Sequence, residues 1–184
     1  YNTSLGGLIP TNPTLAGYTF NGWSTNSASN IANFTSSTAV TEHTTVYAIW
    51  TADVYTVTFD LDDTILTGSG LYGTSIGAMT GTTIGGAEAQ AQKTGHTFLG
   101  WATDPAANTP DLSITGTTSI TGITTYYAVY QHEIYTITFD YGDKRPYLTG
   151  TGIYGTSLGS LSGSSIEAAS AAAVVEGYRL TGWK

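Results

Sequence analysis

Histidine is the side chain that most readily transfers protons near neutral pH, and the chain contains three histidines. His96 occupies a place that Tyr18 and Tyr178 fill in two similar segments. His43 and His132 fall at positions unrelated to it and to each other. Because these positions form no catalytic spacing, we expect structural or solvent-exposed histidines. The sequence predicts no catalytic residue, no cofactor and no enzyme activity.

Three carboxylates that lie close together in the sequence, Asp60, Asp62 and Asp63, are the candidates for a metal site. Calcium takes about six to eight oxygen ligands, and carboxylates supply them well. However, the corresponding turn after Asp140 carries a lysine and an arginine where the metal would lie. We therefore favour a solvated turn in which aspartate side chains bond to the backbone, and keep calcium binding by the first turn as the weaker alternative.

Aromatic side chains are the remaining candidates for chemistry, because their faces can stack on sugar rings. Each of the tryptophans at 23, 101 and 183 follows a glycine at one fixed place in a recurring segment, which favours packing in a core over binding of carbohydrate. We expect a set of recurring aromatic residues to form the buried framework of the protein. Its members are Trp23, Trp101, Trp183, Tyr55, Phe59, Tyr135, Phe139, Tyr47 and Tyr127.

The recurrence extends to the whole chain, which resembles itself at an interval of about 80 positions. Four segments return in the same order. They are 55–60 with 135–140, 1–6 with 72–77 and 154–159, 17–23 with 95–101 and 177–183, and 44–50 with 124–130. We predict a complete repeat at 51–131, preceded by the later part of a first repeat at 1–50 and followed by the earlier part of a third at 132–184.

Alternation of apolar and polar residues predicts the strands that position these aromatic side chains. From Tyr55 to Leu61 every second residue is apolar, which is the pattern of a strand with one buried face. The stretch 65–76 is less regular and interrupted by glycines, so we expect a bent hairpin partner. The segments 97–102 and 124–130 are rich in aromatic and β-branched residues and predict two further strands.

A helix is predicted between these two pairs of strands. Ser164 and Glu167 have the spacing of a capping box, and the alanine-rich run that follows ends before Gly177. This predicts a helix over 164–176, and a weaker one over 83–94, where two glycines lie near the start. The order strand, strand, helix, strand, strand predicts an α+β class: tandem β-grasp-like modules, mainly β with one short helix in each.

Net charge excludes several classes of partner. The formal charge is −8 with only five lysines and arginines, so we expect no binding of nucleic acid or of anionic membranes. No window of about 18 residues is uninterruptedly apolar, so this segment is not expected to insert into a membrane. The sequence has no cysteine. A surface rich in hydroxyl groups and poor in charge favours an extracellular location.

The recurring segments resemble the Listeria-Bacteroides repeat, also called the internalin B-type repeat. The matching segments are YTVTFD at 55–60, GYTFNGW at 17–23 and TTVYAIW at 44–50. The resemblance covers essentially the whole chain and implies β-grasp-like modules strung in tandem in secreted or wall-attached bacterial proteins, between an adhesive tip and an anchor. One departure is the long segment 60–95, whose topology the resemblance does not define.

Together these features predict structural stalk or spacer repeats of a bacterial adhesin, located at the cell surface or in the cell wall. Short connectors at 51–53 and 131–133 lack glycine and proline, so we expect a semi-rigid rod in which each repeat has the neighbouring repeats as partners. Two alternatives stay open. The repeats could themselves bind a host glycan or protein, or they could self-associate through edge strands.

Overall fold

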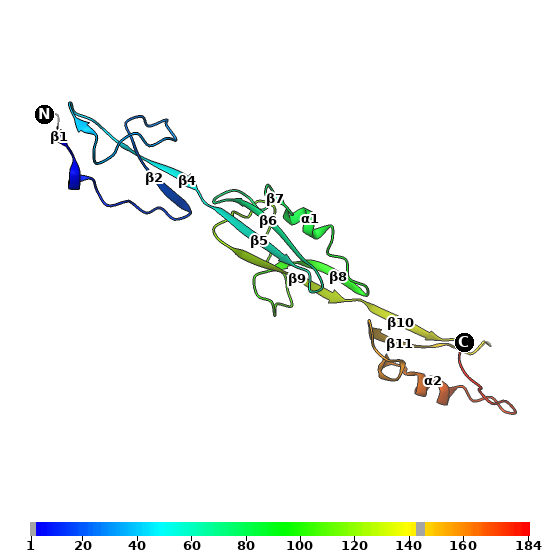
Figure 1. The fold of residues 1–184 in the computed structure, drawn as a ribbon. Helices are drawn as coiled ribbons and strands as arrows, with labels where there is room; N and C mark the ends of the chain where they lie inside the picture. The colour runs from blue at the N-terminus through cyan, green and yellow to red at the C-terminus, as the bar shows by residue number, and fades with distance from the viewer. Residues whose placement is uncertain (1–2, 143–145) are drawn as a thin grey trace. The chain divides into compact units, whose positions relative to one another are not determined.

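The computed structural model describes residues 3–142 and 146–184 of the chain (Figure 1). Contacts in space divide it into two compact units. One unit comprises Tyr1–Gln90 and Gly100–Ala128, and the other comprises Ala91–Leu99 and Val129–Lys184. The division into repeats at 1–50, 51–131 and 132–184 remains a prediction from the sequence.

The N-terminal part of the first unit contains two small antiparallel sheets. Strand β1 (Thr3–Ser4) pairs with β3 (Ala39–Val40), and a 3-10 turn, η1 (Gly6–Leu8), follows β1. The longer strands β2 (Tyr18–Ser24) and β4 (Tyr47–Ala52) pair over their whole length. The pairing shifts by one residue between Phe20 and Gly22, which forms a β-bulge directly before the tryptophan.

The predicted complete repeat forms a five-stranded sheet in the order β7-β6-β5-β9-β8. Strand β5 pairs in antiparallel fashion with β6 and in parallel fashion with β9, so it lies inside the sheet (Figure 1). A short helix, α1, precedes β8. The bounds are β5 (Val54–Asp60), β6 (Ile65–Leu71), β7 (Thr80–Gly81), α1 (Ile84–Glu88), β8 (His96–Ala102) and β9 (Thr124–His132).

The C-terminal part repeats the first half of this arrangement. Strand β10 (Ile134–Phe139) pairs with β11 (Leu148–Ile153), which pairs with β12 (Ser162–Gly163). A 3-10 turn, η2 (Leu158–Ser160), and a helix, α2 (Ile166–Ala172), complete it. In this sheet β10 is an edge strand, whereas its counterpart β5 has neighbours on both sides.

Burial follows the predicted alternation along β5. Val57, Phe59 and Leu61 belong to the core, which confirms a strand with one buried face. In β10 the only core residue is Phe139. The core of the predicted complete repeat is contributed by the sheet, by α1 and by the long connections. Its apolar members are Val57, Phe59, Leu61, Ile76, Met79, Ile84, Ala87, Ala91, Trp101, Ala102, Ile120, Tyr126 and Val129.

Both helices are shorter than predicted, and the predicted capping box of Ser164 and Glu167 is wrong. The N-cap of α2 is Ser165, whose hydroxyl accepts a hydrogen bond from the Ala168 amide, so the cap lies one residue after Ser164. The helix ends at Ala172 instead of reaching residue 176. Helix α1 is capped by Thr83 and contains only Ile84–Glu88. Its sequence IGGAE carries two glycines, which are poor helix formers.

The predicted strand over 65–76 is also too long. Strand β6 ends at Leu71, because Gly73 adopts a positive φ of 80° and turns the chain away. Two glycines inside the strand serve close packing: a Cβ at Gly68 would lie 2.2 Å from the Thr82 carbonyl oxygen, and one at Gly70 would lie 2.5 Å from Ile120. Strand β7 was not predicted. The strands over 97–102 and 124–130 are confirmed as β8 and β9.

Candidate functional site

The junction between β4 and β5 lies within the first unit and consists of a single residue, Asp53. Its backbone N–H donates to the carbonyl oxygen of Gly17 at 2.9 Å. Its own carbonyl accepts a hydrogen bond from the Tyr72 N–H at 2.8 Å. The Asp53 carboxylate accepts a further bond from the Thr19 hydroxyl at 2.6 Å. One connecting residue therefore binds the segment before β2 to the segment after β6.

At the same junction the ring of Tyr72 lies directly on Gly17. A Cβ at Gly17 would stand 2.1 Å from two carbons of this ring, a separation that no real side chain could adopt. Gly17 also has a positive φ of 76°, as the third residue of a turn closed by the Tyr18 amide and the Leu15 carbonyl. The Tyr18 ring meets Tyr72 edge-on at 5.6 Å between centroids. We call this set of contacts the first joint.

The second unit contains the same arrangement between β9 and β10, which we call the second joint. Glu133 is the connecting residue. Its N–H donates to the Gly95 carbonyl, and its carbonyl accepts from the Tyr154 N–H, both at 2.9 Å. A Cβ at Gly95 would stand 2.0 Å from the Tyr154 ring, and Gly95 has a φ of 69°. The sequence identified these segments as recurring, but it did not predict that they contact one another. Each joint combines the connecting residue with two segments that are remote in the sequence, and only the fold brings these into contact.

The second joint also brings together two histidines that the sequence treated as unrelated. The rings of His96 and His132 lie 4.3 Å apart between centroids, and His96 meets Tyr154 edge-on at 5.9 Å. Lys93 lies over the Tyr130 ring at 5.2 Å. These are packing contacts of aromatic rings around a turn. The third histidine, His43, is exposed.

Among the described residues, hydrogen bonding and burial shift the pKa values of Tyr135, Tyr126 and Asp111. The Tyr135 hydroxyl donates to the Glu133 carboxylate, and this bond is the main reason that the pKa of Tyr135 is raised. Burial is the main cause of the raised pKa of Tyr126, with a smaller contribution from the charge of Asp111. The pKa of Asp111 is lowered because its carboxylate accepts bonds from the hydroxyl and the amide of Ser113.

The acidic cluster forms a turn. The Asp60 carboxylate accepts a hydrogen bond from the Asp62 amide at 3.0 Å, and Asp62 adopts a positive φ of 68°. In the corresponding turn the Asp140 carboxylate accepts from the Gly142 amide at 2.9 Å, and Gly142 has a φ of 69°. The lysine and the arginine that follow lie outside the described residues. The described turns therefore match the aspartate-to-backbone arrangement that the sequence favoured.

Across residues 3–142 and 146–184, no three histidine, aspartate or glutamate side chains are grouped closely enough to hold a metal ion. In the same part of the chain, no helix has the length and apolar character that crossing a membrane requires.

The aromatic framework residues do not share one environment. Trp101, 2% exposed, packs against Phe59 at 5.0 Å, and in the second unit Trp183 packs against Phe139 at 5.2 Å. Trp23, Tyr55 and Tyr127 are half-buried, like Trp183. The expectation of burial is wrong for Tyr47 and Tyr135, which are 42% and 46% exposed. In the strand β9 the preceding residue, Tyr126, takes the core position.

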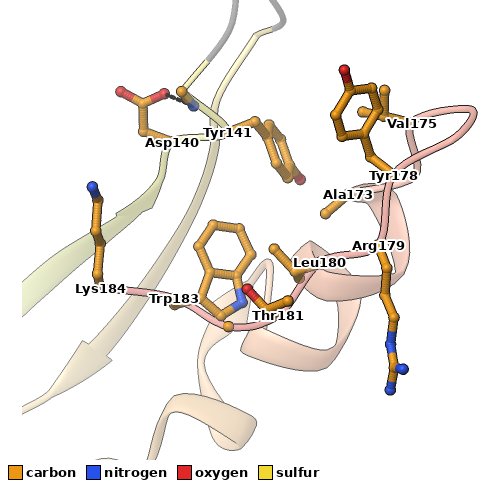
Figure 2. A pocket seen from close by; sticks show the side chains of 12 residues that line it. Asp140, Tyr141, Ala173, Val175, Tyr178, Arg179, Leu180, Thr181, Trp183 and Lys184 are labelled. Carbon is orange, nitrogen blue, oxygen red and sulfur yellow. Dashed lines mark hydrogen bonds between the residues drawn. The ribbon is translucent and has the colours of Figure 1, made fainter.

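A pocket of about 910 Å³ lies in the second unit, next to Trp183 (Figure 2). The pocket is lined by the turn from Asp140 to Gly142, by Ala173 and Val175 just after α2, and by the segment from Tyr178 to Lys184. Figure 2 shows the Arg179 side chain directed away from the Trp183 ring, with Lys184 on the other side of that ring. The two cations therefore do not form a common anion site.

Comparison with the predicted complete repeat explains this pocket. There, β9 pairs with β5 from Val57 to Asp60, and Tyr126 of β9 stacks on Phe59 at 5.9 Å. The corresponding edge of β10 has no strand beside it among the described residues. The pocket is lined by Asp140 and Tyr141, at the end of that open edge. The pocket therefore lies at the end of a strand edge whose counterpart on β5 is covered by β9.

Comparison with known families identifies the type of repeat. The family model described as the Listeria-Bacteroides repeat domain matches residues 1–49 and 55–129, which is more than half of the chain. No curated protein and no solved structure matches the chain.

Proposed function

Because the chain belongs to the Listeria-Bacteroides repeat domain family, we propose that it is a non-catalytic stalk segment of a bacterial surface adhesin. In this function the modules hold a binding domain at a distance from the cell, outside the cytoplasm and attached to the cell surface or wall. The neighbouring repeats of the same chain are the principal partners of each module. The low content of lysine and arginine and the lack of cysteine are compatible with this location.

The observation that carries the proposal is the one-residue connection between consecutive sheets. Asp53 and Glu133 each have both backbone groups engaged in hydrogen bonds to segments on either side of the connection. A linker held in this way cannot sample the conformations that a free linker would. This supports a spacer that restricts bending at each joint, which is what a stalk requires.

We further propose that the module is β-grasp-like. The support is the strand order β6-β5-β9-β8, in which the first and last strands of the repeat are adjacent and parallel at the centre of the sheet. A parallel pair between strands so far apart in sequence needs a crossover, and here the crossover includes α1.

Small-angle X-ray scattering on the purified chain tests the stalk function. We expect scattering curves that a single extended particle with restricted bending explains. The matched control replaces Asp53 and Glu133 by five-residue Gly/Ser linkers, which should shift the curves towards freely moving modules. If the unmodified chain already behaved as freely moving modules, the stalk function would be contradicted.

Self-association through edge strands is the second candidate function, and the position of β8 at the edge of the five-stranded sheet supports it. An unpaired strand edge is a template for strand addition from another chain. Light scattering over a hundredfold range of protein concentration would then show growing particles. A mass that stays monomeric over the whole range would eliminate this function.

A further inference from the structure

We propose that Tyr72 and Tyr154 lock each repeat to the preceding one by packing on a glycine that no other residue can replace. The acceptor surface is Gly17 with Tyr18 in the first joint and Gly95 with His96 in the second. The partner that fits this surface is the tyrosine of the Tyr-Gly-Thr segment in the next repeat. This inference rests on the proposed function, since it assigns the contact through which a stalk would transmit force.

Steric complementarity makes the contact specific. At both joints the tyrosine ring occupies the volume that a Cβ would need, at separations of 2.1 Å and 2.0 Å. Contacts of real Cβ atoms are never this short, so even an alanine would have to displace the ring or the backbone. The ring is therefore held against the glycine backbone, and the distance between the two repeats is set by that contact.

Main-chain hydrogen bonds connect the same residues. At the first joint the Tyr72 amide is bound to the carbonyl of Asp53, and the Asp53 amide is bound to the carbonyl of Gly17. The second joint repeats this chain of bonds through Glu133. The ring of each tyrosine thus packs directly on the glycine, and the amide of the same tyrosine is connected to that glycine through the hydrogen bonds of the connecting residue. Removing the ring should loosen both bonds, because the ring packs on the same glycine whose carbonyl accepts the bond from the connecting residue.

The third glycine of the motif, Gly177, shows the turn without the tyrosine contact. Gly177 has a φ of 78°, and its turn is closed by a hydrogen bond from the Tyr178 amide to the Val175 carbonyl at 3.0 Å. No described residue lies within 4 Å of the place of a Cβ at Gly177, and Tyr178 is 82% exposed. The turn therefore forms without a covering tyrosine. The ring contact at the other two glycines belongs to the joint and not to the turn.

Amide hydrogen exchange on the complete chain tests the lock residue by residue. Tyr72→Ala should accelerate exchange of the Asp53 amide at least tenfold and leave the Glu133 amide unchanged. Tyr154→Ala should have the reverse effect. In both variants the amides at the centre of β5, from Val57 to Phe59, should keep the exchange rates of the unmodified chain. These residues lie further along the strand and do not take part in the contact between the tyrosine and the glycine.

Gly17→Ala should reproduce the effect of Tyr72→Ala, and Gly73→Ala is its matched control. Gly73 also has a positive φ, of 80°, but a Cβ there would have no described atom within 4 Å. It should leave the Asp53 amide unchanged. Two results would overturn the lock: no acceleration in Tyr72→Ala, or equal acceleration at Asp53 and in the centre of β5, which would make Tyr72 a stability residue of its own repeat. Both results concern the joint only, and scattering decides the stalk function separately.

Discussion

Phe59 lies at the centre of the packing in the predicted complete repeat. Its ring is fully buried and contacts Trp101 and Tyr126, one from β8 and one from β9. These contacts connect the two ends of the repeat, since β5 begins it and β9 closes it. The ring therefore contributes both apolar burial and the link that holds the parallel pair together.

We predict that Phe59→Ala destabilises the first unit by about 3–5 kcal/mol, because it removes a large buried side chain and leaves a cavity. Tyr47→Ala is the control, since Tyr47 on β4 is largely exposed, and it should cost less than about 1 kcal/mol. Urea denaturation followed by tryptophan fluorescence measures both. Equal losses would show that the core is assigned wrongly.

Tyr135 predicts a specific sensitivity to alkaline pH. Its pKa is raised in the folded chain by the hydrogen bond to Glu133, so the protonated hydroxyl stabilises the fold. This contribution is complete below the pKa of an unfolded tyrosine, about 10, and is lost as the pH rises through the higher folded value. Between pH 9 and pH 11.5, the melting temperature of the unmodified chain should therefore fall further than that of the Tyr135→Phe variant.

Thermal unfolding by circular dichroism at both pH values measures this difference. Tyr147→Phe is the matched control, because Tyr147 is an exposed tyrosine in the same unit. It should show the alkaline loss of the unmodified chain. If the melting temperature of Tyr135→Phe fell as far as that of the unmodified chain, the hydrogen bond from the hydroxyl to the carboxylate would not contribute to stability.

At the scale of elements, helix α1 is a weak helix that tertiary packing maintains. It has five residues, of which two are glycines, and short helices are marginal without packing. Ile84 and Ala87 are buried and hold it in place. The exposed face is free of such contacts: a Cβ at Gly85 would have no described atom within 4 Å.

We predict that Gly85→Ala stabilises the first unit by about 0.5–1 kcal/mol, because alanine restricts the unfolded chain and favours the helix. Gly68→Ala should have the opposite effect and cost about 1–3 kcal/mol, since its Cβ would collide with the Thr82 carbonyl. Chemical denaturation of both variants gives the two changes in the free energy of unfolding. A destabilising Gly85→Ala would contradict the exposed position of this residue.

For the whole molecule, the turns at Asp60 and Asp140 argue against a dependence on metal ions. One oxygen of each carboxylate already accepts a backbone amide, and the described residues contain no group of three ligands that could hold a metal. We predict that millimolar calcium or EDTA changes the melting temperature by less than about 1 °C. A calcium-dependent rise would follow from mass action if a site existed, and would restore the calcium alternative.

The whole molecule also depends on how consecutive sheets connect. The same backbone hydrogen bonds occur at Asp53 and at Glu133, although the Glu133 side chain is one methylene group longer and accepts from Tyr135 instead of Thr19. The main chain therefore defines the joint, and the side chain adds a local bond that differs between the two. This explains why the joint does not require the same acidic residue at each connection.

The sequence alone determined the strands with strict alternation, the repeat interval and the family. These depend on local periodicity and on recurrence, which are visible without any structure, and the burial of Val57 and Phe59 followed from the alternation along β5. The existence of β8 and β9 followed from their aromatic and β-branched residues, although β9 extends two residues beyond the predicted end. The end of α2 could not be predicted from the sequence. The high helix propensity of the alanine-rich stretch 164–176 does not indicate where tertiary packing stops supporting the helix.

Only the tertiary structure decided which recurring residues touch. Gly17 and Tyr72 lie 55 positions apart, and each could be interpreted as a turn residue and a core residue on its own. The fold brings them together because β4 continues into β5 through one residue, which places the start of β2 beside the end of β6. The chemistry of the joint is thus a property of strand pairing, which local sequence patterns do not encode.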